Sequence, residues 1–418
     1  MADGGKKFPM TVIVGMIVVG VLLGVLIGAW LTTLDQTTQL AQQSLYFASL
    51  ASTLFIDLLK MVLVPLVFSS IVVGVANLQT HHKINRVWIV TIVYFLLTMM
   101  LAILLGLIVT NVLRPGDALQ MSMFQDAMQA YDTKSMSWQV FFAQFLHSLF
   151  LNPLSAMAQG QILAVVVFAL IFGIALIVGG NRYSNILTLM KEFLELLLML
   201  VNWIMRLAPF GIMALLIQLI ALQNMELLMT LIQFVYVVIG TTLFHGLIVL
   251  PLILFLTTGT SPIKLWKGAR EALITAFATS SSAATLPITL RCVEQYLHVK
   301  PDVARFVLPV GATMNMDGTA LYEAIAALFI ANLVGVDLNL TQQLIIFFTA
   351  MFAAIGAPGI PSAGMITMVM VLQAVGLPVE AIAILLPVDR LLDTFRTTVN
   401  VEGDIVGSII VQHWVDKT

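Results

Sequence analysis

Residues 389–404 read Asp-Arg-Leu-Leu-Asp-Thr-Phe-Arg-Thr-Thr-Val-Asn-Val-Glu-Gly-Asp, within a largely apolar segment at 377–414. The stretch holds six charged side chains, although only 10% of the whole chain is charged. Because charge at membrane depth is costly, such side chains normally face a protein interior or a wet cavity. Helical spacing predicts that one face of a helix carries Asp389, Asp393, Arg396, Thr397, Asn400 and Asp404. The pattern indicates a polar binding stripe that offers both anionic and cationic groups.

The composition of the chain indicates the solvent in which it folds. Of its 418 residues 60% are hydrophobic, and the mean hydropathy is +1.03, whereas soluble proteins are about 45–50% apolar. Long apolar runs recur along the whole length, which predicts a polytopic membrane protein. No basic patch is long enough to indicate a nucleic-acid partner. The one cysteine, Cys292, excludes an intrachain disulfide and a thiolate metal cluster.

Hydropathy divides the N-terminal part of the chain into apolar segments of helix length. The first, at 8–31, is too long for a signal-peptide core and lacks a small-residue cleavage site, so we expect a membrane span. The other expected segments are 44–78 (interrupted by Lys60 and Pro65), 87–112, 137–180 (several short helices), 184–222 (with Pro209 near its middle) and 225–257.

In the C-terminal part, polar, small or proline residues interrupt the apolar segments. These segments are 262–296 (interrupted at 279–287), 302–333 (interrupted at 315–318), 338–375 (interrupted at 354–364) and 377–414. Helix breakers at membrane depth are tolerated only where the backbone is buried in protein or lines a cavity. We therefore expect two re-entrant hairpins, each followed by a helix with buried polar groups. In transporters, such paired interrupted segments indicate a binding site near the membrane midplane.

The basic residues predict the orientation of the chain. They fall on one side of the membrane if both interrupted hairpins re-enter, and an excess of Lys and Arg marks the cytoplasmic side. We therefore expect a multi-pass protein of the plasma (inner) membrane with both termini in the cytoplasm. The first hairpin would enter from inside and the second from outside. The residues concerned are Lys6, Lys7, Lys83, Arg86, Arg182, Lys264, Lys267, Arg270, Lys300 and Arg305.

Four motifs together carry a family resemblance. They are the serine-rich tip at 279–287, Asn-Met-Asp-Gly-Thr at 315–319, the Gly- and Pro-rich tip at 354–364, and Arg-Thr-Thr-Val-Asn-Val at 396–401. In this order they resemble the glutamate transporter family, the dicarboxylate/amino acid:cation symporters, over essentially the whole chain. The resemblance implies an all-α polytopic membrane protein with eight transmembrane helices and two re-entrant helical hairpins, arranged as inverted repeats.

The resemblance also implies a homotrimer that works by an elevator motion. A scaffold part, at about 8–78 and 137–222, would hold the trimer. A transport part, at about 87–112 and 225–414, would carry the substrate and would include the hairpins at 262–296 and 338–375. Because the two parts interleave, residues 1–418 form one membrane domain.

The substrate implied by the resemblance is an acidic amino acid. Arg396 would pair with its side-chain carboxylate, Asp393 with its α-amino group and Asn400 with its α-carboxylate. The residue types agree with this assignment, because a planar guanidinium binds a carboxylate bidentately. The alternative is a mutual ion pair of Asp393 and Arg396, three residues apart on one helix, with no ligand. The remaining implied contacts are Ser281, Ser282, Thr319, Gly359 and Thr397, with the tip at 356–364 as a lid.

The resemblance implies sodium as a coupling ion and no cofactor. One sodium site would use Gly311, Asn315, Asn400 and Asp404. A second would use Thr313, Met316 and the carbonyl groups of Ala354, Ile355 and Ala357. A third would use Asp317 and Asn315 with side chains of the helix at 87–112, among them Thr98.

The chain departs from the family pattern at several positions. Phe95 and Met99 stand where a tyrosine and a small hydroxyl residue are expected, which weakens the third sodium site. Glu323 matches a glutamate that the animal glutamate carriers use for proton coupling, and burial favours the protonated form of a carboxyl group. The alternative is that Glu323 pairs with an arginine or with Tyr322. Family members carry a further arginine, either in the first hairpin or beside the aspartate of the eighth helix. This chain has Ser280 and Thr394 at these two positions, and Arg390 is a candidate for the role of that arginine. We expect His245 to be a packed histidine.

These observations predict a symporter that imports L-glutamate or L-aspartate with Na+, H+ or both. A C4-dicarboxylate carrier is one alternative, but succinate has no ammonium group to balance Asp393. A neutral amino acid carrier is another, because Glu402 stands in a variant typical of the animal neutral exchangers, but those lack an arginine at the position of Arg396. A passive anion channel is an alternative of a different class. An enzyme is not expected, because a hydrolase using Ser281 or Ser282 would need a base that the sequence does not offer nearby.

Overall fold

The computed structural model describes residues 10–34, 38–76, 85–117, 147, 149–223, 225–357, 359 and 361–416. Every regular element within these residues is helical. The helices are α1 (Met10–Thr32), α2 (Gln39–Ala76), α3 (Asn85–Leu113), α6 (Pro153–Ala158), α7 (Ile162–Gly179), α8 (Ser184–Met205), α9 (Ala208–Gln223), α10 (Met225–Phe244), α11 (Leu250–Thr258), α12 (Pro262–Thr279), α13 (Ser282–Gln295), α14 (Pro301–Met314), α15 (Asp317–Leu333), α16 (Leu340–Gly356), α17 (Ala363–Ala374) and α18 (Ile382–Asp416). Three short turns, η3 (Gly180–Tyr183), η4 (His245–Val249) and η5 (Val379–Ala381), lie before α8, α11 and α18.

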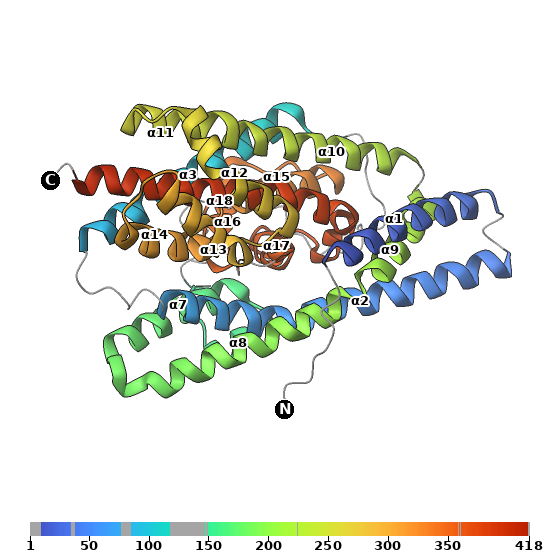
Figure 1. Cartoon of the computed structure of the whole chain (residues 1–418). Coiled ribbons are helices and arrows are strands. Elements are labelled where there is room, and N and C mark those ends of the chain that lie inside the picture. Colours follow the sequence, from blue (N-terminus) through green and yellow to red (C-terminus); the bar gives the residue numbers. More distant parts are fainter. Residues whose placement is uncertain are drawn as a thin grey trace.

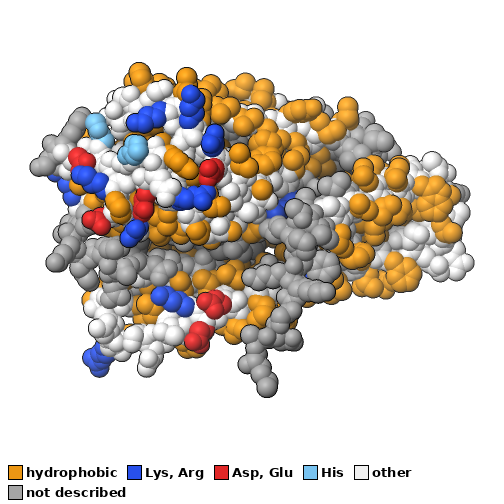
Figure 2. All heavy atoms as spheres, in the orientation of Figure 1, with side chains coloured by type: hydrophobic (Ala, Val, Ile, Leu, Met, Phe, Trp, Pro, Cys, Tyr) orange, Lys and Arg blue, Asp and Glu red, His pale blue; other side chains and the backbone are white. Residues whose placement is uncertain are grey.

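Several helices have the length and composition of membrane spans. Three described stretches, Arg86–Leu113, Ala164–Met205 and Met229–Thr258, are long and apolar enough to cross a membrane. Large apolar side chains point outward, among them Leu26 and Ile108, which are 65% and 61% exposed. Figure 2 shows an apolar surface over much of one face, with charged side chains gathered near the ends of α11, α14 and α18 and along α8. Such a surface is stable only against lipid or protein, which supports a multi-pass membrane protein.

Both interrupted segments form helical hairpins, as the sequence predicts. The first consists of α12 and α13, which pack on each other and are joined at Ser280 and Ser281. The second consists of α16 and α17. Each tip contains a serine in the left-handed region, with φ of 50° at Ser280 and 59° at Ser362. A non-glycine residue rarely adopts this conformation, so each tip is held by its surroundings.

The helix that follows the first hairpin is also broken, as predicted, and α14 and α15 meet at Asn315 and Met316. Nearly every residue of α15 is buried, because α3, α10, α16 and α18 all pack around it. An apolar sequence on all sides of a helix is typical of such a central position. The 35-residue helix α18 lies beside it and carries residues 389–404.

Three details of the predicted segments are wrong. Helix α2 starts at Gln39 rather than 44 and continues through Pro65, because neighbouring helices make a proline tolerable inside a transmembrane helix. The segment at 184–222 divides before α9, so Pro209 lies in the first turn of a helix, where its missing N–H is not needed. The segment at 225–257 contains a π-helical turn at His245–Val249. The predictions made for Lys6, Lys7, Lys83 and Pro358 lie outside the described residues.

The helices form two groups around one apolar core. In Figure 1, α2, α7 and α8 run together along one side, and α2 packs on both α7 and α8. The second group surrounds α18, which packs on α3, α10, α11, α12, α14 and α15. One buried apolar cluster includes residues of α2, α7, α15, α16 and α17 and therefore joins the groups. The breaks in both hairpins and in the α14–α15 pair come together against α18, which positions the site described next.

Candidate functional site

The polar residues of α18 form a buried stripe, as their spacing predicts. Arg396 is 0% exposed, and its neighbours on the stripe are almost as inaccessible. The buried members are Asp389, Arg390, Asp393, Arg396, Thr397, Asn400, Glu402 and Asp404. Because a buried ion needs partners, the contacts of each member show how the stripe is arranged.

Arg396 lies at the centre of the arrangement. Its Nη2 donates to Asp389 Oδ1 and to Asp393 Oδ1, both at 2.8 Å. Its guanidinium carbon lies 4.0 Å from the centre of the Tyr322 ring, in cation–π geometry. Its Nε and Nη1 are buried and have no partner among the described residues. The predicted ion pair of Asp393 and Arg396 therefore forms, yet it leaves two guanidinium nitrogens free for a ligand.

Asp393 joins α18 to the tip of the second hairpin. Its Oδ2 accepts a hydrogen bond of 2.8 Å from the backbone N–H of Ser362. The same oxygen lies 3.6 Å from Nη1 of Arg390. Arg390, whose role was open from the sequence, thus faces the carboxylate that is predicted to bind the α-amino group. A ligand ammonium group that bound Asp393 Oδ2 would compete with the Ser362 N–H.

The tips of the two hairpins touch each other. The hydroxyl of Ser281 donates to the carbonyl oxygen of Gly359 at 2.7 Å, and the N–H of Ala283 donates to the same oxygen at 3.2 Å. Gly359 also lies against α14, because a Cβ added to it would be 2.6 Å from the carbonyl oxygen of Ala312. Only glycine fits there without movement of the backbone. Ser282, the next predicted contact, is buried beside this junction.

Asn400 ties α18 to the first turn of α15. Its Oδ1 accepts from the backbone N–H of Gly318 at 2.8 Å, and its Nδ2 donates to the hydroxyl of Thr319 at 3.2 Å. Gly318 is another position of close approach, since an added Cβ would lie 2.5 Å from the carbonyl oxygen of Arg396. Thr397, which lies between Arg396 and Asn400 on α18, is also buried. Three of the predicted substrate contacts, Thr319, Thr397 and Asn400, therefore lie in one region.

An oxygen-rich cluster lies further along α18. The side-chain amide of Asn315 donates to Asp404 Oδ1 at 3.0 Å, and its Oδ1 is buried with no partner among the described residues. Gly311 lies directly against the Asp404 carboxylate, and a side chain there would collide with it. A hard cation such as Na+ prefers carboxylate, amide and carbonyl oxygens. The chemistry of these groups, including the unpaired amide oxygen, fits the first predicted sodium site.

The predicted third sodium site has an unexpected partner. Thr98 on α3 donates to Asp317 Oδ1 at 3.2 Å, so these two predicted ligands lie side by side. His245, in the π-helical turn, places Nε2 3.1 Å from Asp317 Oδ2, and both side chains are 0% exposed. His245 is buried, as expected of a packed histidine, and the sequence did not predict that the buried carboxylate of Asp317 is its polar partner. Phe95 is buried and offers no oxygen ligand.

A tyrosine nevertheless reaches this region from the neighbouring position. The hydroxyl of Tyr94 donates to the carbonyl oxygen of Gly403 at 3.4 Å. The rings of Tyr94 and Phe95 both lie close to Gly407, at 2.8 Å and 3.0 Å from an added Cβ. Met99, the other departure from the family pattern, is 0% exposed and belongs to the apolar core. Phe95 thus lacks the hydroxyl that the family pattern places there, but the preceding residue of α3, Tyr94, supplies one.

The second predicted sodium site is only partly assembled. Thr313 and Ile355 line one small cavity between α2, α7, α14 and α16. Met316, Ala354 and Ala357 are buried nearby in sequence, within the main apolar cluster. The hydroxyl of Thr313 donates to the carbonyl oxygen of Val310 at 3.0 Å.

Glu323 is fully buried on α15 and faces the second hairpin. The hydroxyl of Thr367 on α17 donates a short hydrogen bond to its Oε1, and its Oε2 has no partner among the described residues. The alternative that pairs Glu323 with Tyr322 does not hold, because the Tyr322 hydroxyl contacts the sulfur of Met365 at 3.0 Å. The carboxyl group is thus isolated and touches the hairpin that also contacts Asp393.

Sequence comparisons connect this geometry to known proteins. The family model described as the sodium:dicarboxylate symporter family matches residues 13–414. The chain belongs to the sodium:dicarboxylate symporter family. It is 34% identical to an excitatory amino acid transporter of Caenorhabditis elegans, across 98% of this chain and 88% of the relative. It is 33% identical to excitatory amino acid transporter 3 of Homo sapiens, across 96% of this chain and 84% of the relative. It is also 33% identical to neutral amino acid transporter B(0) of Mus musculus, across 96% of this chain and 80% of the relative.

For this symporter, sequence reasoning named Asp389 and Glu402 without assigning their partners, and it missed Ser362. Asp389 shares Arg396 with Asp393, and Ser362 contacts Asp393 through its backbone. Glu402, which stands beside the stripe, accepts a 2.8 Å hydrogen bond from the indole N–H of Trp266 on α12. A charged residue in an apolar segment is a usable signal for Asp389. Nothing in the sequence signals the backbone contact of Ser362, since any residue carries an N–H group.

Proposed function

We propose that the protein is a secondary active symporter that imports acidic amino acids, L-glutamate or L-aspartate, together with Na+. The observation that carries this proposal is Arg396, a fully buried guanidinium group with Nε and Nη1 unpaired. A buried cation with free donors is costly unless a ligand completes its hydrogen bonds. The two free nitrogens are charged donors, and each can form a charge-assisted hydrogen bond to a substrate carboxylate.

The α-amino group of the substrate would bind Asp393. Asp393 Oδ2 accepts a hydrogen bond from the Ser362 N–H at the tip of the second hairpin. An incoming ammonium group would replace this contact, so substrate entry requires the tip to move away. The second hairpin would therefore act as the lid. Ser281, Ser282, Thr319, Gly359, Thr397 and Asn400 would complete the substrate site.

Charge balance gives a physical reason for coupling. Asp389 and Asp393 offset Arg390 and Arg396, so these four side chains add no net charge. An acidic amino acid brings a net charge of about −1 into the same dry environment, which is costly without a cation. Na+ would bind at Asp404, whose partner Asn315 has an unpaired oxygen. Asn400 lies between the two sites, because the Asn315 amide also lies 3.5 Å from its carbonyl oxygen.

We assign a proton-carrying role to Glu323. Its isolation from charged hydrogen-bond partners favours the neutral form, and its contact with Thr367 connects its protonation to the second hairpin. Protonation would convert the free Oε2 into a donor. The proton would thus add positive charge near the substrate during import, as Na+ does.

The larger assembly is also part of the proposal. The group formed by α2, α7 and α8 would serve as the scaffold of a homotrimer, and the helices around α18 would move as an elevator. The dense packing of α2 on α7 and α8, and of α18 on the helices around it, supports this division. Both termini would lie in the cytoplasm and the chain in the inner membrane.

A neutral amino acid carrier is the second candidate. Its support is the similarity to neutral amino acid transporter B(0) together with Glu402 in the motif at 399–404. The unpaired nitrogens of Arg396 favour an acidic substrate, because an apolar side chain would leave these buried donors without an acceptor. A dicarboxylate has no ammonium group, so it would leave Asp393 without the substrate group that it is proposed to bind.

Uptake by reconstituted protein tests the proposal. Proteoliposomes would receive radiolabelled L-aspartate, L-alanine or succinate under an imposed Na+ gradient, an H+ gradient, both or neither. We expect L-aspartate to accumulate above equilibrium when the Na+ gradient is present, which also distinguishes a carrier from a passive anion channel. No accumulation of L-aspartate under any gradient would refute the proposal.

A further inference from the structure

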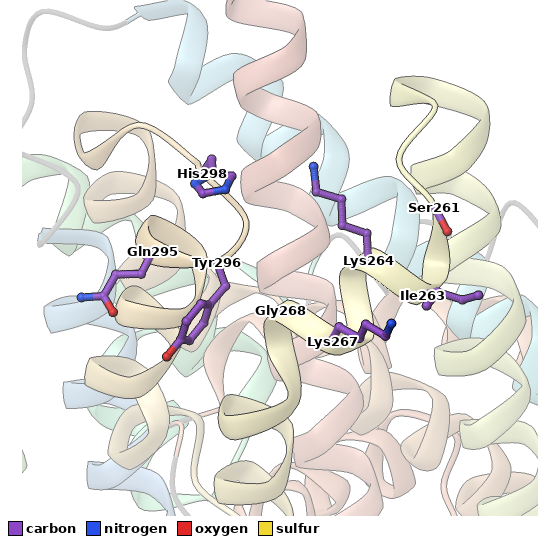
Figure 3. Close-up of a pocket in the computed structure, with 8 residues that line it drawn as sticks. All are labelled: Ser261, Ile263, Lys264, Lys267, Gly268, Gln295, Tyr296 and His298. Carbon is purple, nitrogen blue, oxygen red and sulfur yellow. The ribbon is translucent and has the colours of Figure 1, made fainter.

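A second polar cavity lies at the base of the first hairpin, away from the tip. It has a volume of about 590 Å³ and is open to the exterior. Figure 3 shows its two walls: Lys264 and Lys267 come from the first turns of α12, whereas Tyr296 and His298 follow the end of α13. The lining residues are Ser261, Ile263, Lys264, Lys267, Gly268, Gln295, Tyr296 and His298. Two ammonium groups and no carboxylate line the cavity.

Lys264 and Lys267 are exposed and have no acidic partner among the described residues. Nearby basic side chains are paired: Arg291 with Glu271, Arg305 with Glu294, and Lys300 with Asp416. Within the described part of the chain, neither Lys264 nor Lys267 forms an ion pair or a side-chain hydrogen bond. Since Glu271, Glu294 and Asp416 are paired with other cations and no acidic residue lines the cavity, the cavity carries a net positive charge.

Other groups of the cavity also suit an anion. Ser261 precedes α12 and its hydroxyl makes no capping hydrogen bond, so it is free to donate. Backbone N–H groups and the positive end of the helix dipole face the same region at the start of α12. Gln295, Tyr296 and His298 add further donors on the facing wall. The combination of two ammonium groups with hydroxyl and amide donors matches the chemistry of a phosphate group.

The surroundings of the cavity indicate the source of that phosphate. Helix α11 ends directly before it and exposes Phe255 and Leu256, at 52% and 73%. Ile263 stands on the cavity wall and is 62% exposed. The polar cavity therefore opens beside an exposed apolar surface. Basic pockets between transmembrane helices are typical binding sites for anionic lipid headgroups.

We propose that this cavity binds the phosphate group of an anionic phospholipid, with Lys264 and Lys267 as its principal contacts. The acyl chains would lie along α11 beside Leu256 and Ile263. The walls belong to both arms of the first hairpin, so a bound headgroup would hold the base of α12 against the end of α13. Gly268 on the floor already packs closely there, since an added Cβ would be 2.5 Å from Leu297.

Binding of short-chain lipids to the purified full-length protein in detergent tests this proposal. Dioctanoyl phosphatidylglycerol, dioctanoyl phosphatidylcholine and inorganic phosphate would each be titrated by calorimetry. The variants are Lys264→Gln/Lys267→Gln, the charge-retaining Lys264→Arg/Lys267→Arg, and Lys191→Gln on the exposed surface of α8 as a matched control. Since one lysine near an anionic surface contributes about fivefold in affinity, the double glutamine variant should bind phosphatidylglycerol about thirtyfold more weakly.

The expected result is saturable binding of phosphatidylglycerol that the arginine variant and Lys191→Gln retain. Phosphatidylcholine, which has no net charge, should bind much more weakly. Displacement of phosphatidylglycerol by millimolar inorganic phosphate would assign the site to free phosphate and overturn the lipid assignment. Equal binding by the wild type and the double glutamine variant would overturn the proposal altogether. Thermal unfolding of each variant shows whether a loss of binding reflects a loss of fold.

Discussion

Replacement of Arg396 by lysine isolates the role of the guanidinium shape from that of its charge. A lysine keeps a positive charge beside Asp389 and Asp393, so the buried carboxylates keep a partner. It cannot, however, offer two parallel N–H groups to a carboxylate. We therefore expect Arg396→Lys to fold and to bind acidic amino acids weakly.

The magnitude follows from the hydrogen bonds of Arg396. Its Nη2 serves Asp389 and Asp393, while Nε and Nη1 are free. An ammonium group has three N–H donors, of which two would be needed for the same carboxylates, which leaves one for the substrate. The variant thus loses one charge-assisted hydrogen bond, worth about 1.5–3 kcal/mol. This corresponds to a loss of affinity of about 10-fold to 150-fold.

Uptake of L-aspartate into proteoliposomes measures this loss as an increase in KM under a saturating Na+ gradient. The matched control is Arg291→Lys, an exposed arginine paired with Glu271 at the surface, which should leave KM unchanged. Thermal unfolding monitors the fold of both variants. An unchanged KM for L-aspartate in a folded Arg396→Lys protein would refute the assignment of the free guanidinium nitrogens to the substrate carboxylate.

Three further predictions concern the hairpin junction, the isolated glutamate and the buried histidine. Gly359→Ala should lower uptake at least tenfold, because the added Cβ would meet the Ala312 carbonyl oxygen at 2.6 Å and separate the two tips. Initial uptake rates of L-aspartate measure this loss. Glu323→Gln should remove the pH dependence of uptake and leave its Na+ dependence, since the amide cannot carry a proton; uptake from pH 5 to pH 8 measures it. His245→Ala should destabilise the protein by about 1–3 kcal/mol by leaving an oxygen of Asp317 unpaired; the melting temperature measures it.

Each of these predictions has a control and a contradicting result. Gly240→Ala is the control for the hairpin variant, because no atom lies within 4 Å of its added Cβ, and full uptake by Gly359→Ala would contradict the first prediction. A pH profile of Glu323→Gln that matches the wild type would remove the proton role. His245→Gln, whose amide can still donate, should recover most of the stability. Equal melting temperatures for His245→Ala and the wild type would show that the contact with Asp317 contributes little.

Much of the fold could be predicted because the membrane simplifies the pattern. Apolar runs can cross a bilayer only as helices or closed barrels, so the helices follow from hydropathy and the two hairpins from the interruptions at 279–287 and 354–364. Proline was a less reliable signal. Pro65 lies inside α2, whereas Pro209 lies just after a break, because the neighbours of each helix decide whether a missing hydrogen bond is tolerated.

The sequence by itself determined which residues of α18 share a face, because the helical repeat fixes their spacing. It also determined that their charge must be buried away from lipid. Only the tertiary structure decided the partners: Arg396 with both Asp389 and Asp393, His245 with Asp317, and the Ser362 N–H with Asp393. These pairs join residues of different helices or depend on side-chain rotamers and backbone direction. Helical periodicity specifies a face of one helix, but the packing of helices specifies what that face meets.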